Sequence, residues 1–124
     1  MRRYHIKVYT DKKHYQILLD FINNLNRLKW GYTDHCIDNI KTRSIDLGVL
    51  LRYIKDIKLE VNQIFEYYLK GYEDRPEKIC CRLPYTQRED IILVIDENKK
   101  IITIWINSKT DNHETLKKEL YITV

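Results

Sequence analysis

Residues 90–108 read DIILVIDENKKIITIWINS, and this stretch decides the fold of the chain. Two apolar, β-branched runs, residues 90–96 and 100–108, flank the turn-forming residues 97–99. Runs of this kind around a loop of roughly three to five residues predict an antiparallel β-hairpin. Their apolar residues fall on both faces of each strand, which is typical of strands central to a sheet that helices cover.

Further strands are expected on the N-terminal side of this hairpin. Residues 73–76 carry a turn signal, and residues 78–83 then have the pattern of a strand. Residues 61–70 are compatible with a helix or a strand, and their β-branched and aromatic content favours a strand from Ile64. Residues 4–9 alternate between apolar and polar side chains, which suits a short strand.

The N-terminal half has helical spacing instead. An amphipathic helix is expected from about Lys12 to Leu28, with Gly31 ending it, and two shorter helices follow. The expected N-caps are Asp11 for the first helix, Thr33 or Asp34 for the second, and Ser44 or Asp46 for the third. Helices that precede an antiparallel meander define an α+β fold.

The length of 124 residues predicts a single domain, residues 1–124, and 44% hydrophobic with 32% charged residues is a globular composition. The three cysteines are Cys36, Cys80 and Cys81; two adjacent residues of a strand point to opposite faces and do not readily pair. Reduced thiols, no signal peptide and no apolar run near the roughly 20 residues of a spanning helix predict a soluble, cytoplasmic protein without a membrane partner.

A net charge of +4 is compatible with a nucleic-acid partner and with many other proteins. The three glycines, Gly31, Gly48 and Gly71, are isolated, which excludes glycine-rich nucleotide loops. Asp111 and His113 could ligate a metal ion, but no third ligand stands at a suitable spacing. The sequence therefore predicts neither a metal site nor a cofactor.

Polar side chains follow the last core strand and give the most informative segment of the chain. They include Asn107, Lys109, Asp111, His113 and Thr115. One interpretation is a polar loop that leads into a short helix ending near Leu120. The other is that these side chains gather at a strand end, where a sheet often supports a functional site.

Arg88 immediately precedes the hairpin. The start of the first strand of an antiparallel hairpin lies beside the end of the second. We therefore expect Arg88 near Asn107 and Lys109, where two cations, a histidine and amide or hydroxyl groups suit a phosphate. The alternative is a pair of solvated cations that happen to be neighbours. His35 begins a second constellation with Asp38 on one helix face, although a lone histidine at a helix start is more often a surface residue.

The hairpin, the segment NSKTDNHETL of residues 107–116 and Tyr121 resemble the C-terminal halves of small phage and toxin ribonucleases. These belong to the superfamily that groups barnase, EndoU, the tRNA-cleaving colicins and RelE. Residues 35–45, a histidine followed by basic residues and Arg-Ser-Ile, resemble the helical segment before the sheet in that group. The resemblance covers residues 33–121.

This resemblance implies N-terminal helices packed on a four-stranded antiparallel sheet, with RNA, including tRNA, bound across the sheet. It implies a metal-independent endoribonuclease, toxin or phage effector, that leaves a cyclic phosphate and is held by an acidic antitoxin or immunity protein. The implied catalytic residues are His35, Arg88, Lys109 and His113. The implied substrate-binding residues are Arg43, Asn107, Thr115 and Tyr121. The alternative is a non-catalytic nucleic-acid- or protein-binding module on the same fold.

Overall fold

The computed structural model describes residues 2–5, 12–43, 46–69, 75–109 and 122–123 of the chain. Helices come first and strands dominate the second half, so the predicted α+β class is confirmed. In chain order the elements are β1 (Arg2–His5), α1 (Lys12–Leu25), β2 (Gly31–Tyr32), α2 (Asp34–Arg43), α3 (Leu47–Ile54), the 3-10 turn η2 (Val61–Gln63), β3 (Ile64–Leu69), β4 (Pro76–Pro84), β5 (Glu89–Asp96), β6 (Lys100–Ser108) and β7 (Ile122–Thr123).

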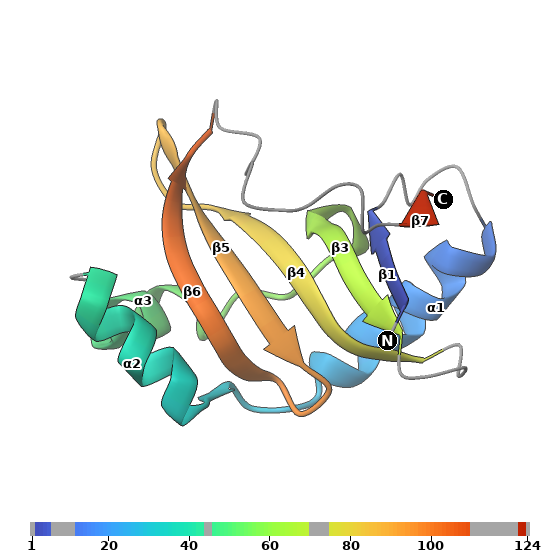
Figure 1. Cartoon of the computed structure of the whole chain (residues 1–124), viewed down its shortest axis with the longest axis horizontal. Helices are drawn as coiled ribbons and strands as arrows, with labels where there is room; N and C mark the ends of the chain where they lie inside the picture. The colour runs from blue at the N-terminus through green and yellow to red at the C-terminus, as the bar shows by residue number, and fades with distance from the viewer. Residues whose placement is uncertain (1, 6–11, 44–45, 70–74, 110–121, 124) are drawn as a thin grey trace.

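The described strands form one seven-stranded sheet in the order β2-β6-β5-β4-β3-β1-β7 (Figure 1). Strands β3 to β6 are an antiparallel meander in which each strand pairs with the next along the chain. Strand β1 pairs antiparallel with β3, while the two-residue strands β2 and β7 pair in parallel with β6 and β1. The expected four-stranded antiparallel sheet is therefore wrong: the sheet is wider and mixed, because segments distant in sequence join both of its edges.

The loop of the β5–β6 hairpin is closed by Asp96. Its Oδ1 accepts hydrogen bonds from the backbone N–H of Asn98 at 2.9 Å and of Lys100 at 3.0 Å. Its carbonyl oxygen accepts a third from the N–H of Lys99 at 3.1 Å. Lys99 has a φ of 61°, in the left-handed region that few residues other than glycine and asparagine adopt readily. The predicted hairpin is thus confirmed, with Lys99 as the residue that turns the chain.

Strand β2 is attached to this hairpin by main-chain hydrogen bonds. The N–H of Gly31 donates to the carbonyl of Lys99 at 3.1 Å, and the N–H of Thr33 donates to the carbonyl of Ile101 at 3.0 Å. Gly31 therefore starts a strand, and the prediction that it ends the first helix is wrong. That helix ends at Leu25 rather than near Leu28, because the chain must then turn toward the sheet edge.

The helix starts follow the expected capping chemistry. The hydroxyl of Thr33 accepts a hydrogen bond from the N–H of Cys36 at 3.2 Å, at the start of α2. The carboxylate of Asp46 accepts one from the N–H of Val49 at 3.2 Å, at the start of α3. Each side chain satisfies a backbone donor that has no partner within the helix. These two predicted caps are confirmed, and Asp11 and Ser44 lie outside the described residues.

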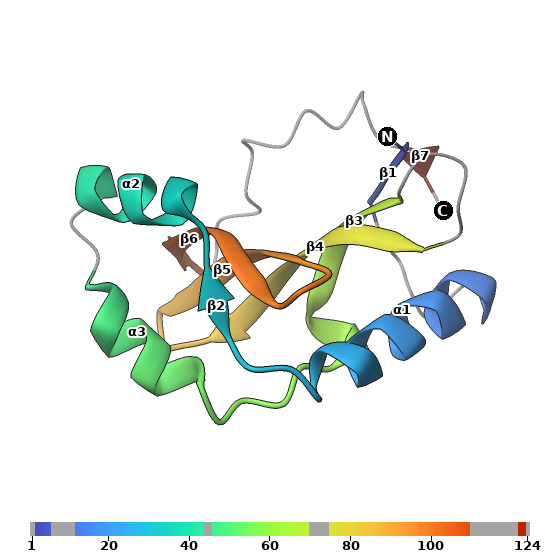
Figure 2. The same cartoon turned by 90° about the horizontal axis from the view of Figure 1, so that it is seen from below.

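One face of the sheet contributes to a single hydrophobic core. Alternate residues of the central strands lie in it, and the buried faces of the three α-helices join the same cluster. The core members from the helices are Leu18, Phe21, Ile22 and Leu25 of α1, Cys36 and Ile40 of α2, and Leu50 and Ile54 of α3. Figure 2 shows α1 and α3 on the same side of the sheet, with α2 beside β6 at its edge.

The opposite face of the sheet has a different character. Arg82, Ile92 and Trp105 are in register across β4, β5 and β6, so their side chains share this face. Ile92 is buried but lies outside the main core cluster. The second face is therefore where charged and aromatic side chains of neighbouring strands meet.

None of the described helices is both long enough and apolar enough to cross a lipid bilayer.

Candidate functional site

The open end of the β5–β6 hairpin brings together residues from both sides of the hairpin. The N–H of Lys109 donates to the carbonyl of Arg88 at 2.9 Å, and Asp90 lies opposite Asn107 in the strand register. The expectation that Arg88 lies near Asn107 and Lys109 is thereby confirmed at the level of the backbone. The cause is the antiparallel register, which places the start of β5 beside the end of β6.

A carboxylate lies at the centre of this end of the sheet. Asp90 Oδ1 is 2.6 Å from Lys109 Nζ, and Asp90 Oδ2 is 3.3 Å from Arg82 Nη1. The Asp90 side chain is only 9% exposed, whereas those of Arg82 and Lys109 are 27% and 36% exposed. One buried anion therefore holds two cations, one before it on β4 and one after it beyond β6, and each cation keeps a part of its surface in water. We name Arg82, Asp90 and Lys109 the strand-end cluster.

The strand-end cluster is arranged to bind an anion. Charge-assisted hydrogen bonds to a fixed carboxylate restrict the rotamers of both cations, so less conformational entropy is lost when a ligand arrives. An ammonium has three N–H donors, and the contact of Lys109 with Asp90 uses one of them. Half-buried Asn107 faces the same side of the sheet as Asp90. A phosphate oxygen is a suitable acceptor for such a set of donors.

Sequence reasoning found Lys109 but missed its two partners, Arg82 and Asp90. Asp90 is the first residue of one predicted strand, and Arg82 is a member of another. The available signal was the two-residue period, which puts Arg82 on the face away from the core residues Cys81 and Leu83. The two-residue period does not predict the register between β4 and β5, and this register places Arg82 within reach of Asp90.

The loop before β5 is held in a defined conformation. The hydroxyl of Thr86 accepts hydrogen bonds from the N–H of Arg88 at 3.3 Å and of Glu89 at 3.0 Å. The carbonyl of Glu89 accepts from the N–H groups of Tyr85 and Thr86 at 3.2 and 3.0 Å. Arg88 is exposed on this loop. The loop therefore presents a third cation next to the strand-end cluster from a backbone that its own hydrogen bonds restrain.

His35 lies elsewhere. It is the second residue of α2 and is exposed. Thr33, two residues earlier, donates a backbone hydrogen bond to Ile101 near the start of β6. Lys109 comes eight residues after Ile101, which in an extended strand is about 26 Å. Figure 1 shows α2 starting beside the beginning of β6, away from its end. His35 is thus not part of the strand-end cluster.

Four further candidate residues have a limited structural description. Arg43 is the last residue of α2. His113, Thr115 and Tyr121 lie outside the described residues.

The cysteines are not candidates for a nucleophile at neutral pH. Burial, with the nearby Glu66 carboxylate, raises the pKa of Cys80, and burial raises the pKa of Cys81 and of Cys36. Each thiol stays protonated in the folded protein, and the thiolate is the reactive form. Within the described ranges, no group of three or more histidine, cysteine or acidic side chains is arranged to hold a metal ion.

No family model, no curated protein and no solved structure matches this chain. The geometry shows one buried carboxylate on the face of a β-sheet between two partly exposed cations.

Proposed function

We propose that the protein is an endoribonuclease that cuts RNA without a metal ion and leaves a 2′,3′-cyclic phosphate. The observation that carries this proposal is the buried carboxylate of Asp90, which holds Arg82 and Lys109 at 3.3 and 2.6 Å. In phosphoryl transfer the largest contribution usually comes from fixed groups that stabilise the charge developing on the phosphate. Two restrained cations at a strand end are groups of this kind.

In the proposed reaction, the ribose 2′-oxygen attacks the adjacent phosphorus, and the bond from phosphorus to the 5′-oxygen breaks. A base takes the proton from the 2′-hydroxyl, and an acid gives a proton to the departing 5′-oxygen. Arg82 and Lys109 contact the non-bridging oxygens, and Arg88 binds a neighbouring phosphate. His113 is the proposed acid or base, since it follows Lys109 by four residues and is within about 14 Å of it by chain length.

The natural substrate is proposed to be a cytoplasmic RNA such as a tRNA. Asn107, Thr115 and Tyr121 would then contact the RNA beside the scissile phosphate. A cell that makes such an enzyme, as a toxin or after phage infection, must restrain it. An acidic antitoxin or immunity protein that covers the cations of the strand-end cluster would do this through charge complementarity.

Binding of RNA without cutting is the second candidate, and the position of His35 favours it. The described groups at the strand-end cluster are cations, a carboxylate and an amide, and the described His35 does not lie among them. Arg43 stays a proposed RNA-binding residue in either case. A binding protein of this kind shows an affinity for RNA that falls steeply with salt concentration and shows no turnover.

The test incubates purified protein with total tRNA and with an unstructured RNA, in the presence of EDTA. Arg88→Gln is the main variant because Arg88 is exposed and its loss leaves the Asp90 ion pairs in place. Arg75→Gln is the matched control, since Arg75 pairs with Glu97 beside the hairpin loop, away from the cluster. His113→Ala and His35→Ala complete the set.

Cleavage to fragments with cyclic phosphate ends, reduced by Arg88→Gln and His113→Ala but not by Arg75→Gln or His35→Ala, is the expected result. If the RNA stays intact at high protein concentration and Arg88→Gln weakens RNA binding, the nuclease proposal is wrong and the binding protein is the function supported. Absence of both cleavage and binding would remove both candidates.

A further inference from the structure

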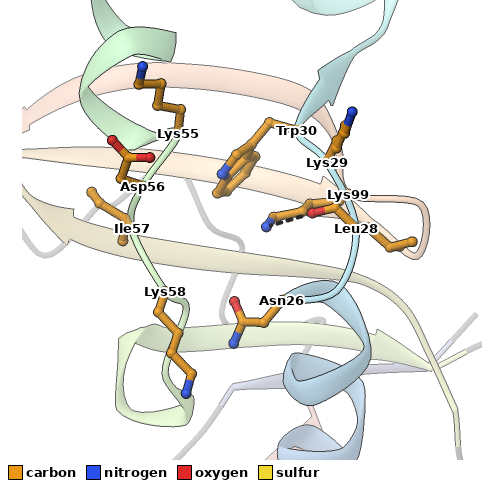
Figure 3. A pocket seen from close by; sticks show the side chains of 9 residues that line it. All are labelled: Asn26, Leu28, Lys29, Trp30, Lys55, Asp56, Ile57, Lys58 and Lys99. Atoms are coloured by element: carbon orange, nitrogen blue, oxygen red, sulfur yellow. Dashed lines mark hydrogen bonds between the residues drawn. The ribbon is translucent and has the colours of Figure 1, made fainter.

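A pocket of about 540 Å³ lies at the hairpin-loop end of the sheet, opposite the strand-end cluster (Figure 3). Its walls are the chain after α1, residues 26–30, and the chain after α3, residues 55–58, with Lys99 of the hairpin loop between them. The lining includes four lysines, Lys29, Lys55, Lys58 and Lys99, against one acidic residue, Asp56. Within the described part of the chain none of these lysines has an ion pair.

Lys99 is the unusual member of this group. The residue is only 5% exposed, its Nζ donates to the carbonyl of Leu28 at 3.2 Å, and the same Nζ lies 4.7 Å from the centre of the Trp30 ring. Burial lowers the pKa of Lys99. Figure 3 shows its ammonium between the two walls, directed into the pocket. A buried charge is normally paired with an opposite one, and across the described residues no carboxylate pairs with this ammonium.

The backbone holds Lys99 in this position. Its N–H is bonded to the carbonyl of Asp96, its carbonyl accepts from the N–H of Gly31, and its φ is 61°. A left-handed conformation at a residue other than glycine costs about 1–3 kcal/mol and persists when the surroundings fix it. The ammonium is therefore offered to the pocket from a rigid turn, and little freedom remains to be lost when an anion binds.

We propose that this pocket binds the phosphate group of a mononucleotide-sized ligand, with Lys99 in contact with the phosphate. Lysine is a regular point-charge partner of phosphate, and the other three lysines raise the local positive potential. A volume near 540 Å³ falls within the roughly 300–1,000 Å³ of small-molecule sites and exceeds the need of a single phosphate. Leu28, Trp30 and Ile57 supply an apolar wall for a base or sugar.

The side-chain amide of Asn26 in the pocket wall is already engaged. Asn26 donates through Nδ2 to the carbonyl of Leu59 at 3.0 Å and accepts through Oδ1 from its N–H at 3.0 Å. The charged donors of the pocket are its lysines, and the phosphate is the part of the ligand that they recognise. Among the described residues the buried indole N–H of Trp30 has no hydrogen-bond partner and is a further donor for the ligand. The phosphate could belong to a free nucleotide or to the 5′-end of an RNA. The site does not depend on the proposed nuclease, because it shares no residue with the strand-end cluster.

The test uses the fluorescence of Trp30, which is adjacent to the Lys99 ammonium. The chain has two tryptophans, so Trp105→Phe leaves Trp30 as the only tryptophan. Uridine monophosphate, uridine, inorganic phosphate and a short RNA with either a 5′-phosphate or a 5′-hydroxyl are each titrated. We expect a saturable change in emission with uridine monophosphate and none with uridine. If the natural phosphate is the 5′-end of an RNA, the RNA with a 5′-phosphate should also change the emission.

Lys99→Met keeps the length of the side chain and removes a charge that no carboxylate of the described residues pairs with, so the variant should fold and its melting temperature is checked first. It should weaken binding of the monophosphate by at least about tenfold, the loss of one charge-assisted hydrogen bond. Lys100→Met, at the exposed neighbouring position, is the matched control and should stay within about twofold.

Equal affinity for uridine and its monophosphate would overturn the proposal, as would equal losses in Lys99→Met and Lys100→Met, which indicate diffuse attraction only. RNA cleavage is measured in the same Lys99→Met protein. Loss of nucleotide binding with unchanged RNA cleavage supports the proposed phosphate site in the pocket. Absence of cleavage in every variant contradicts only the proposed nuclease activity.

Discussion

Replacement of Asp90 by asparagine tests the electrostatic core of the strand-end cluster. The substitution keeps the shape of the side chain and leaves Arg82 and Lys109 without the anion that lies 3.3 and 2.6 Å from them. Removal of one partner from a fully buried ion pair costs about 3–5 kcal/mol. Here water can reach both cations, whose side chains are 27% and 36% exposed, so we expect a loss of about 2 kcal/mol in the free energy of unfolding.

For a domain of 124 residues this loss corresponds to a decrease of about 8 °C in Tm. Urea unfolding and thermal unfolding, both followed by circular dichroism, measure it. A double-mutant cycle with Lys109→Met isolates the Asp90–Lys109 pair and should give a coupling of about 1–2 kcal/mol. The matched control is Glu97→Gln, which removes the same charge from a pair with Arg75 at 3.6 Å whose side chains are 35% and 57% exposed.

The control should lose less than about 0.5 kcal/mol, because water screens an exposed pair. Equal losses in Asp90→Asn and Glu97→Gln, or no coupling with Lys109, would refute the view that Asp90 organises the cluster. The same variant also informs on function. It raises the net charge from +4 to +5, which strengthens non-specific attraction to RNA, so a loss of cleavage with retained binding would report lost positioning of the cations.

Two further predictions concern stability. Asn26→Ala should lower the free energy of unfolding, measured by urea unfolding, by about 2 kcal/mol, because it removes two hydrogen bonds to the backbone of Leu59. Asn26→Asp should lower it by nearly as much, because a carboxylate cannot donate to the Leu59 carbonyl; a neutral effect of both variants would contradict this. Burial raises the pKa of Cys80 and Cys81 above the ordinary 9.0, so only the unfolded chain ionises these thiols near that pH. The free energy of unfolding should therefore fall as the pH rises above about 9, with a shallower fall in a Cys80→Ser, Cys81→Ala variant; identical slopes would contradict the assignment.

Local patterns of the sequence determined most elements of the fold. The two apolar runs around Glu97 gave the hairpin, and Thr33 and Asp46 cap the helices as expected. Each of these features depends on residues within a few positions of one another, so the backbone geometry of one element is enough to predict it. The same reasoning placed Arg88 beside Lys109, because a hairpin register is also local.

Only the tertiary structure decided which charges meet. Asp90 reaches Arg82 through the pairing of β4 with β5, and His35 lies away from Lys109 because β2 attaches α2 to the start of β6. Lys99 meets Leu28, 71 residues earlier, through the path of the chain after α1. Such contacts depend on the order of strands and on the course of connections, which hydrophobic periods do not encode, because a period fixes the face of a side chain and not its neighbour on the next element.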